Sequence, residues 1–265
     1  MGAILALAFC LASCKVNVDD DPTVTQATYI GSKAPTEAKA VGDIVFSDGS
    51  ATPYTADLTL TEEQKSKAVA VIFYVGTECS NDSASRTLGV GLENATGSGN
   101  TLAWARYTSS GDKAEGHSTD ITAIQCTPAD EEDNAATATF SGDTDGSDNW
   151  QALCDAVSDE GTSGNYPAWE WVNAYATTAN LTDDYASGWY LPTVAELSML
   201  YRVKDTVNSA LEKAGGTEIV DAYYWSSSQS ASSEGAAWYV SFGAGGYLDY
   251  YHKDMVRSVC TVRAF

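Results

Sequence analysis

Tyrosine, serine, glycine and aspartate alternate with large apolar residues near the C-terminus, and these residue types are typical of binding surfaces. The alternation is strict over residues 238–242 (WYVSF), and a β-strand has a period of two. We therefore expect Trp238, Val240 and Phe242 on a buried face, and Tyr239 and Ser241 on a face open to solvent. Tyrosine supplies rigid contact area with a hydrogen-bonding tip, and serine and glycine add adaptable polar contacts.

The polar residues of this C-terminal block form the predicted ligand-binding surface. They have small or hydrogen-bonding side chains and lie between the apolar positions: Ser230, Ser232, Ser233, Glu234, Tyr239, Ser241, Tyr247, Asp249, Tyr251, His252 and Asp254. We assign the apolar neighbours Trp225, Trp238 and Phe242 to the scaffold. A surface that accepts many side chains must lie outside the core, because a mismatched core residue costs about 2–5 kcal/mol.

Residues that would support catalysis or metal binding are scarce. The chain has only two histidines, His117 and His252, so a His-based triad or a multi-histidine metal cage is hard to assemble. Four cysteines lie far apart, unlike the close pairs of zinc sites, and are compatible with two disulfides of open pairing or with buried free thiols: Cys79, Cys126, Cys154 and Cys260. We predict no enzyme activity, no metal and no cofactor.

An acidic stretch at residues 141–148 (SGDTDGSD) places three carboxylates among glycines. Calcium favours oxygen clusters of this kind, but the spacing differs from that of the twelve-residue EF-hand loop. We favour a solvated acidic turn over a calcium site, which stays the alternative.

The charge balance is strongly acidic. The 265 residues include 14 Lys plus Arg and 36 Asp plus Glu, a net charge of −22. Such a chain repels phosphate backbones and anionic membrane surfaces, so we expect no nucleic-acid partner. Hydrophobic residues make up 44% of the sequence, enough for a folded core. The acidity is typical of a protein that stays soluble outside the cell.

The N-terminus looks like a bacterial lipoprotein signal. An apolar run from Ile4 to Leu11, too short to span a bilayer, is followed by small residues and Cys14, although no Lys or Arg precedes the run. We expect residues 1–14 to be the signal with Cys14 lipidated, and residues 15–40 to be a flexible tether. The protein would then contact the outer membrane through its lipid anchor alone. A buried N-terminal segment is the alternative.

Hydrophobic patterning predicts the elements that position the binding surface. Apolar runs bounded by turn residues predict strands at 42–46, 68–75, 87–92 and 102–105, whereas 109–148 is polar and irregular. Capping boxes open two helices, Thr61 with Gln64 and Thr193 with Glu196. A further helix is expected at 167–176, with Pro167 near its start.

These elements predict an α+β fold with two longer helices packed on antiparallel β structure and joined by long loops. We expect a single domain over residues 41–265, in which residues 223–265 are the ligand-binding block.

Several short signatures resemble one family in the right order over residues 166–265. They are GWYLPT at 188–193 with Glu196-Leu197, YWSSS at 224–228, Ala237-Trp238, Phe242-Gly243 and the ending VRAF at 262–265. They resemble bacterial and phage variable proteins with a C-type-lectin fold of the formylglycine-generating-enzyme type. The resemblance adds Trp189 and Arg263 to the scaffold. Many relatives end V-R-x-V-R, whereas Cys260 replaces the first arginine here.

The resemblance implies a C-terminal block that a retroelement diversifies by adenine-specific mutagenesis. Randomised adenines in an asparagine codon can give Ser, Tyr, Asp, His, Gly or Ala, but not Lys, Glu, Gln, Met or Trp. The predicted surface residues fall within this set except Glu234, which we therefore treat as a contact and not as a variable position. Trp225, Trp238 and Lys253 fall outside it, as scaffold positions should.

We expect a lipid-anchored, monomeric binding protein at the cell surface, with an unknown protein or carbohydrate ligand. An envelope lipoprotein with a structural or adhesive role and no diversified site is the alternative. An oxidase of the formylglycine-generating type is disfavoured, because its chemistry implies a close C-terminal cysteine pair and the block holds Cys260 alone. The calcium motifs of animal lectins are not found either.

Overall fold

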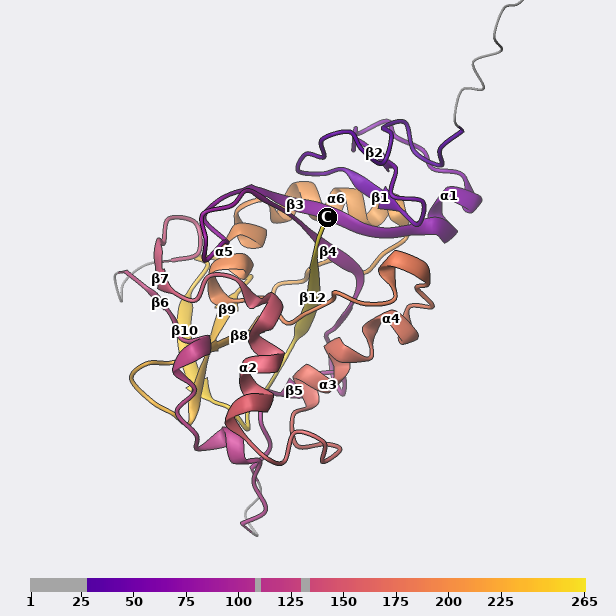
Figure 1. The fold of residues 1–265 in the computed structure, drawn as a ribbon. Coiled ribbons are helices and arrows are strands. Elements are labelled where there is room, and N and C mark those ends of the chain that lie inside the picture. The colour runs from indigo at the N-terminus through magenta and orange to yellow at the C-terminus, as the bar shows by residue number, and fades with distance from the viewer. Residues whose placement is uncertain (1–27, 108–110, 130–133) are drawn as a thin grey trace, which may run out of the picture.

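The computed structural model describes residues 28–107, 111–129 and 134–265, and it has the predicted α+β architecture (Figure 1). The predicted signal with Cys14, and residues 15–27 of the predicted tether, lie outside the described residues. The rest of that tether is not free: Lys33 forms an ion pair with Asp43 at 2.6 Å, and Gln64 donates to the carbonyl of Ile30. The prediction of a tether is therefore wrong for residues 28–40, because side chains of the domain bind this backbone.

The main sheet has five antiparallel strands in the order β12-β4-β3-β1-β2. Its strands are β1 (Ile44–Phe46), β2 (Ala51–Thr52), β3 (Ala68–Gly76), β4 (Arg86–Ala95) and β12 (Val259–Ala264). The apolar run at 68–75 predicts a strand buried on both faces, and β3 is buried from Ala68 to Tyr74. The C-terminal strand β12 pairs with β4, so the end of the chain is built into this sheet.

A second sheet carries the C-terminal block. It has three antiparallel strands in the order β10-β9-β8, with β9 (Ala236–Ser241) between β8 (Tyr223–Gln229) and β10 (Leu248–His252). Two short ladders complete the β structure, one of β5 (Leu102–Ala103) with β11 (Val256–Arg257), the other of β6 (Cys126–Pro128) with β7 (Phe140–Gly142).

Six α-helices occur in the described chain, and their bounds differ in part from the prediction. They are α1 (Glu62–Lys67), α2 (Asn149–Ala156), α3 (Pro167–Asn173), α4 (Tyr175–Thr178), α5 (Val194–Arg202) and α6 (Lys204–Ala214). The helix expected at 167–176 is broken at Ala174 into α3 and α4, and the helix opened by Thr193 gives way to α6 at Val203. Helix α6 packs on β3 and β1 (Figure 1).

Both predicted capping boxes are confirmed. Thr61 accepts from the backbone N–H of Gln64, and Thr193 accepts from that of Glu196, with the reciprocal bond present in each case. Pro167 occupies the first turn of α3, as expected.

Two apolar clusters lie on opposite faces of the second sheet. One, with Trp238, Val240 and Phe242, fills the space toward α5, α6 and the main sheet. The other, with Trp225 and Tyr239, lies toward α2 and α3. The second sheet is therefore covered by a core on each face, and little of either face is exposed to solvent.

The four described cysteines are free thiols. Cys79, Cys126 and Cys260 are buried, and Cys154 is partly exposed, so the free-thiol alternative holds and the disulfides do not form. Burial raises the pKa of the Cys260 thiol to about 12, so Cys260 is a neutral side chain of the core.

Candidate functional site

Strand β10 is an exposed strand of the C-terminal block. It is an edge strand, and the four residues after Leu248 are all exposed: Asp249, Tyr250, Tyr251 and His252. Tyr251 is 46% exposed, and Tyr247, just before the strand, is 63% exposed. The structure thus places four predicted contacts together on this edge: Tyr247, Asp249, Tyr251 and His252.

Three predicted contacts are buried, and the expectation that they face solvent is wrong. Tyr239 and Ser241 are 8% and 6% exposed, and Ser230 is 1% exposed. Strand β9 is the central strand of its sheet, and an apolar cluster covers each of its faces. Its alternate side chains therefore point into two different cores, and neither set faces water. Ser230 is enclosed in the β8–β9 turn, where its backbone N–H donates to Ala236.

The remaining predicted contacts lie in the turns beside β10. Ser232 and Glu234 are exposed and Ser233 is partly exposed in the β8–β9 turn. Asp254, in the turn after β10, is partly buried, and its Oδ1 lies 3.6 Å from Nε2 of His117. Burial lowers the pKa of His117.

Tyr239 contributes to the site through its hydroxyl group and not through an open ring. The hydroxyl donates to Oδ2 of Asp249 at 3.0 Å, and Oδ1 of the same carboxylate accepts from the backbone N–H of Tyr250. Burial and the neighbouring carboxylate raise the pKa of Tyr239 to about 12. This pair joins β9 to β10 and fixes the Asp249 side chain.

An arginine that the sequence analysis missed lies over this face. The Arg257 guanidinium carbon is 3.6 Å from the centre of the Tyr239 ring and 4.9–5.7 Å from those of Trp225, Tyr223 and Tyr251. We call Tyr223, Tyr239, Asp249, Tyr251 and Arg257 the Arg257 patch. Strand pairing sets Tyr239 opposite both Trp225 and Asp249, so this grouping requires the register, which the sequence does not reveal.

Lys253 holds the end of β10 against the rest of the domain. It is completely buried, its ammonium donates to the carbonyl of Gly116 at 2.6 Å, and it lies 4.4 Å from the Trp104 ring centre. Its own carbonyl accepts from the backbone N–H groups of Trp104 and Ala105. The assignment of Lys253 to the scaffold is thus consistent with its contacts.

The predicted scaffold aromatics are buried, and the indoles of Trp225 and Trp189 are hydrogen-bonded into the fold. The indole N–H of Trp225 donates to the carbonyls of Leu102 and Met255, and that of Trp189 donates to the carbonyl of Tyr185. Phe242 and Trp238 belong to the core toward α5, and Trp238 meets Tyr250 edge to face at 5.1 Å. Arg263 is partly exposed and stacks 4.7 Å from the Tyr185 ring centre, donating to the carbonyl of Asp184.

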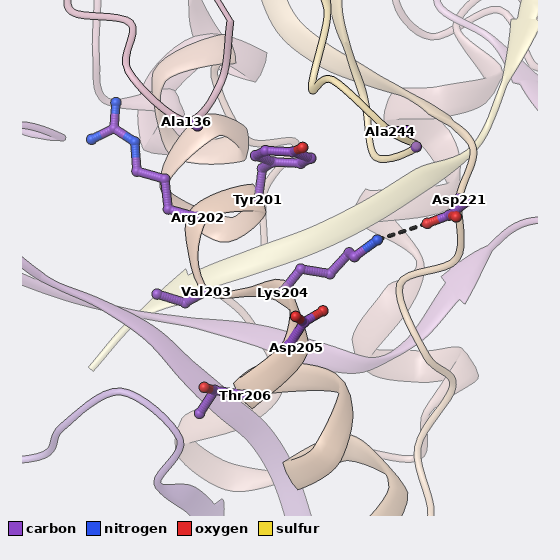
Figure 2. A pocket seen from close by; sticks show the side chains of 10 residues that line it. Ala136, Tyr201, Arg202, Val203, Lys204, Asp205, Thr206, Asp221 and Ala244 are labelled. Carbon is purple, nitrogen blue, oxygen red and sulfur yellow. Dashed lines mark hydrogen bonds and ion pairs between the residues drawn. The ribbon is translucent and has the colours of Figure 1, made fainter.

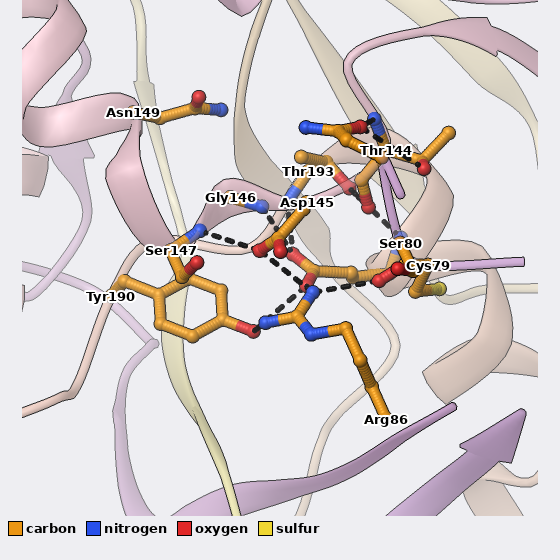
Figure 3. Close-up of polar contacts among 12 residues, drawn as sticks. Cys79, Ser80, Arg86, Thr144, Asp145, Gly146, Ser147, Asn149, Tyr190 and Thr193 are labelled. Carbon is orange, nitrogen blue, oxygen red and sulfur yellow. Dashed lines mark hydrogen bonds and ion pairs between the residues drawn. The ribbon is translucent and has the colours of Figure 1, made fainter. Parts of the chain in front are cut away.

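The acidic stretch at 141–148 is packed against a buried polar network, so the expectation of a solvated turn is wrong for part of it (Figure 3). Arg86 lies 2.7 Å from Asp145 and 3.0 Å from Glu196, and Tyr190 donates to Glu196 at 2.8 Å. Asp143 accepts from the side chain of Asn81. Within the described ranges, no cluster of three His, Cys, Asp or Glu side chains is arranged to hold a metal ion.

Burial raises the pKa of Glu196 to about 7, although Arg86 and the backbone N–H of Thr193 oppose this rise. The network joins strand β4, the start of α5 and the acidic stretch. It therefore has a structural role, and it lies outside the C-terminal block.

A cavity of about 620 Å³ lies between the α5–α6 junction and the β9–β10 loop (Figure 2). Lys204 crosses it to reach Asp221 at 2.7 Å and also donates to the carbonyl of Phe242. Arg202, at its other end, donates to the carbonyls of Ala135 and Ala138. Both cations are thus engaged in holding loops in place.

No helix in the described part of the chain is both long and apolar enough to cross a membrane.

The described chain is an α+β protein with antiparallel sheets and few helices, which is consistent with the predicted C-type-lectin-like architecture, and a solved structure has a similar fold. A fimbrial protein from Bacteroides ovatus matches with a TM-score of 0.56 and 14% identity over 86% of this chain. The match covers 49% of that protein, so the present chain spans about half of its length. At this identity the likeness concerns the fold alone.

The family model of the Lcl C-terminal domain matches residues 96–263. This match covers more than half of the chain, and the protein therefore belongs to the Lcl C-terminal domain family. The matched range includes the whole second sheet, with β10 and the Arg257 patch. Among curated proteins, no sequence matches this chain.

Proposed function

We propose that this protein is a non-enzymatic binding protein displayed at the cell surface, with the exposed edge of β10 as its ligand contact. The observation that carries the proposal is the contrast within the C-terminal block. Tyr247, Tyr251 and His252 are exposed, whereas the aromatic residues beneath them are buried. Membership of the Lcl C-terminal domain family supports a binding role, and the fimbrial description of the Bacteroides ovatus protein is consistent with surface display.

A finer assignment belongs to the same proposal. The signatures at 188–193 and 224–228 resemble those of the Treponema variable protein TvpA, a lipoprotein with the formylglycine-generating-enzyme type of lectin fold. On this basis the chain is anchored in the outer membrane through a lipid on Cys14, and a retroelement rewrites its C-terminal block. The exposed positions Tyr247, Tyr251 and His252 can change without disturbing either core.

The genomic DNA next to the coding sequence tests the diversification. We expect a near-identical repeat of the C-terminal coding block, differing at adenines, beside a reverse transcriptase gene. The differences should fall at the exposed positions and spare the codons of Trp225, Trp238 and Lys253. Sister copies that differ evenly along the chain would favour a structural envelope lipoprotein instead.

Binding itself is tested with arrays of surface proteins and glycans probed with the purified protein. Three single variants, Tyr247→Ala, Tyr251→Ala and His252→Ala, should each bind a captured array component at least tenfold more weakly, because exposed tyrosines often dominate binding energy. Tyr29→Ala is the matched control, because Tyr29 lies outside the block and is 42% exposed, close to the 46% of Tyr251. Unchanged binding by all three variants would refute the assigned contact surface.

The absence of catalysis is tested separately. The chemistry of the formylglycine-generating oxidases, as the resemblance implies, needs a close pair of C-terminal cysteines. The C-terminal block has one cysteine, Cys260, which is buried and has a raised pKa. The purified protein should leave a sulfatase cysteine peptide unchanged. Oxidation of that peptide would contradict the proposal.

A further inference from the structure

The Arg257 guanidinium is held mainly by aromatic rings, and the nearby carboxylate of Asp249 acts on its charge without forming an ion pair in the described residues. It stacks on Tyr239 at 3.6 Å, and the rings of Tyr223, Trp225 and Tyr251 lie within 5.7 Å. Aromatic faces attract a cation through their quadrupole, and a guanidinium stacks well on them. The rings therefore fix the position of the charge without satisfying its N–H donors.

Those donors have few acceptors inside the protein. The buried Nε of Arg257 has no hydrogen-bond partner, and within the described residues no carboxylate forms an ion pair with this side chain. Asp249 shares the face, but its two oxygens accept from the Tyr239 hydroxyl and the Tyr250 N–H. Because Arg257 is partly exposed, an acceptor can reach it from the solvent side.

The surroundings favour a protein as the source of that acceptor. Tyr223, which lies beside Arg257, is 51% exposed. Met255 and Val256, which precede Arg257 in the sequence, are 46% and 58% exposed. Tyr, Arg and Met are enriched at protein interfaces. Apolar side chains of a protein partner would remove the exposed aliphatic groups of Met255 and Val256 from water. The guanidinium already covers the face of Tyr239, so a sugar ring cannot stack there.

We infer that the Arg257 patch receives an Asp or Glu side chain of a protein partner, with Met255 and Val256 forming the apolar rim of the contact. Carboxylates match the guanidinium fork with two parallel hydrogen bonds. The inference rests on the proposed binding function and specifies its partner. Arg257 then supplies the central contact, and the exposed residues of β10 surround it.

A displayed library of random peptides, selected on the full chain, tests the inference. We expect the selected peptides to share an acidic residue flanked by apolar ones. Resynthesis with Glu→Gln or Asp→Asn should weaken binding to the wild type at least tenfold, but weaken binding to Arg257→Gln less than twofold. Arg257→Lys should fall between the two proteins, because it keeps the charge and loses the fork.

Several outcomes would overturn the inference. They are selected peptides without an acidic residue, an equal effect of the Glu→Gln change on both proteins, or no enrichment at all. Binding that depends on Arg257 but is confined to carboxylated or sulfated glycans would overturn the choice of a protein partner. If Arg257→Gln fails to fold by circular dichroism, the comparison of wild type with Arg257→Lys decides.

The same variants separate this inference from the proposed function. If Arg257→Gln keeps the array binding that Tyr247→Ala loses, the inference fails and the binding surface stands. If neither variant changes array binding, the proposed surface fails as well.

Discussion

Lys253 is a charged residue that the fold buries completely in the middle of the C-terminal block. Desolvation lowers its pKa to about 7, although Asp120 and Glu234 oppose the shift. Its ammonium and carbonyl groups together tie the turn after β10 to Trp104, Ala105 and Gly116. A residue with these contacts fixes the end of β10, and every exposed side chain of that strand depends on it.

The buried lysine makes stability depend on pH. Its pKa is lower in the folded state than the ordinary value of 10.5, so the unfolded chain binds more protons between about pH 7 and 10.5. The free energy of unfolding should therefore rise with pH above 7, by up to about 1.4 kcal/mol per pH unit from this group. Urea unfolding at pH 7.0, 8.0 and 9.0 measures it.

The variant Lys253→Met isolates this contribution. It keeps an apolar stem and removes the charge, so the difference between wild type and variant should increase with pH. Lys65→Met, which removes a partly exposed lysine of α1, should keep the wild-type slope. A parallel response of wild type and Lys253→Met would show that Lys253 does not titrate in this range.

At the scale of the element, the two capping boxes have the same local geometry in different surroundings. Thr61 opens α1 on the surface, and Thr193 opens α5 in the interior. Thr193 also donates to the carbonyl of Thr144 at 3.2 Å. The second box therefore fixes a helix and also the acidic stretch beside it.

Replacing each threonine by alanine compares the two. Thr61→Ala should lower the free energy of unfolding by about 1 kcal/mol or less, the usual value of a helix cap. Thr193→Ala should cost about 1–2 kcal/mol more, because this cap is buried and the partly buried carbonyl of Thr144 also loses its donor. Urea unfolding of both variants measures the difference, and equal losses would contradict the role of the second bond.

The turn between β9 and β10 gives a second comparison. Gly246 has a φ of +59°, and a Cβ there would lie 2.6 Å from the ring of Tyr201. Gly97 has a φ of +82° but open space around it. Gly97→Ala should cost about 1 kcal/mol from backbone strain alone, and Gly246→Ala should cost more and displace the turn. Thermal unfolding of both variants checks this order.

Local signals predicted several elements well because the information is local. The capping boxes and the apolar run of β3 depend on residues that are neighbours in sequence, and both were confirmed. The burial of Tyr239 and Ser241 depends on β9 having a partner strand and a core on each side. A strand with a core on each face and a strand with one face in water can show the same alternation of residue types. The alternation therefore could not distinguish the two.

The Arg257 patch was missed for the same reason. Arg257 and Tyr223 are 34 positions apart in sequence and meet because β8 and β11 lie together. Their contacts follow from tertiary arrangement, which no local pattern contains. The exposed contacts Tyr247, Asp249, Tyr251 and His252 could be predicted because they lie close together in sequence, in β10 and just before it.

At the scale of the whole molecule, the acidic charge opposes the compact state. With a net charge of −22, repulsion among carboxylates destabilises the fold at low ionic strength. Raising NaCl from about 10 to 150 mM shortens the Debye length to about 8 Å, so the melting temperature should rise by roughly 2–4 °C. Near the sequence pI of about 4.1 the salt effect should disappear. A salt effect of equal size at both pH values would exclude this explanation.

The separation of fold from binding within the C-terminal block is tested most directly by measuring stability and binding on one library of single substitutions at residues 223–258. Substitutions at Tyr247, Tyr251 and His252 should alter binding and change the unfolding free energy by less than about 0.5 kcal/mol. Truncation of Trp225 or Trp238 should cost about 3–5 kcal/mol. If the same positions govern both properties, or if binding ignores the exposed residues, the account is contradicted.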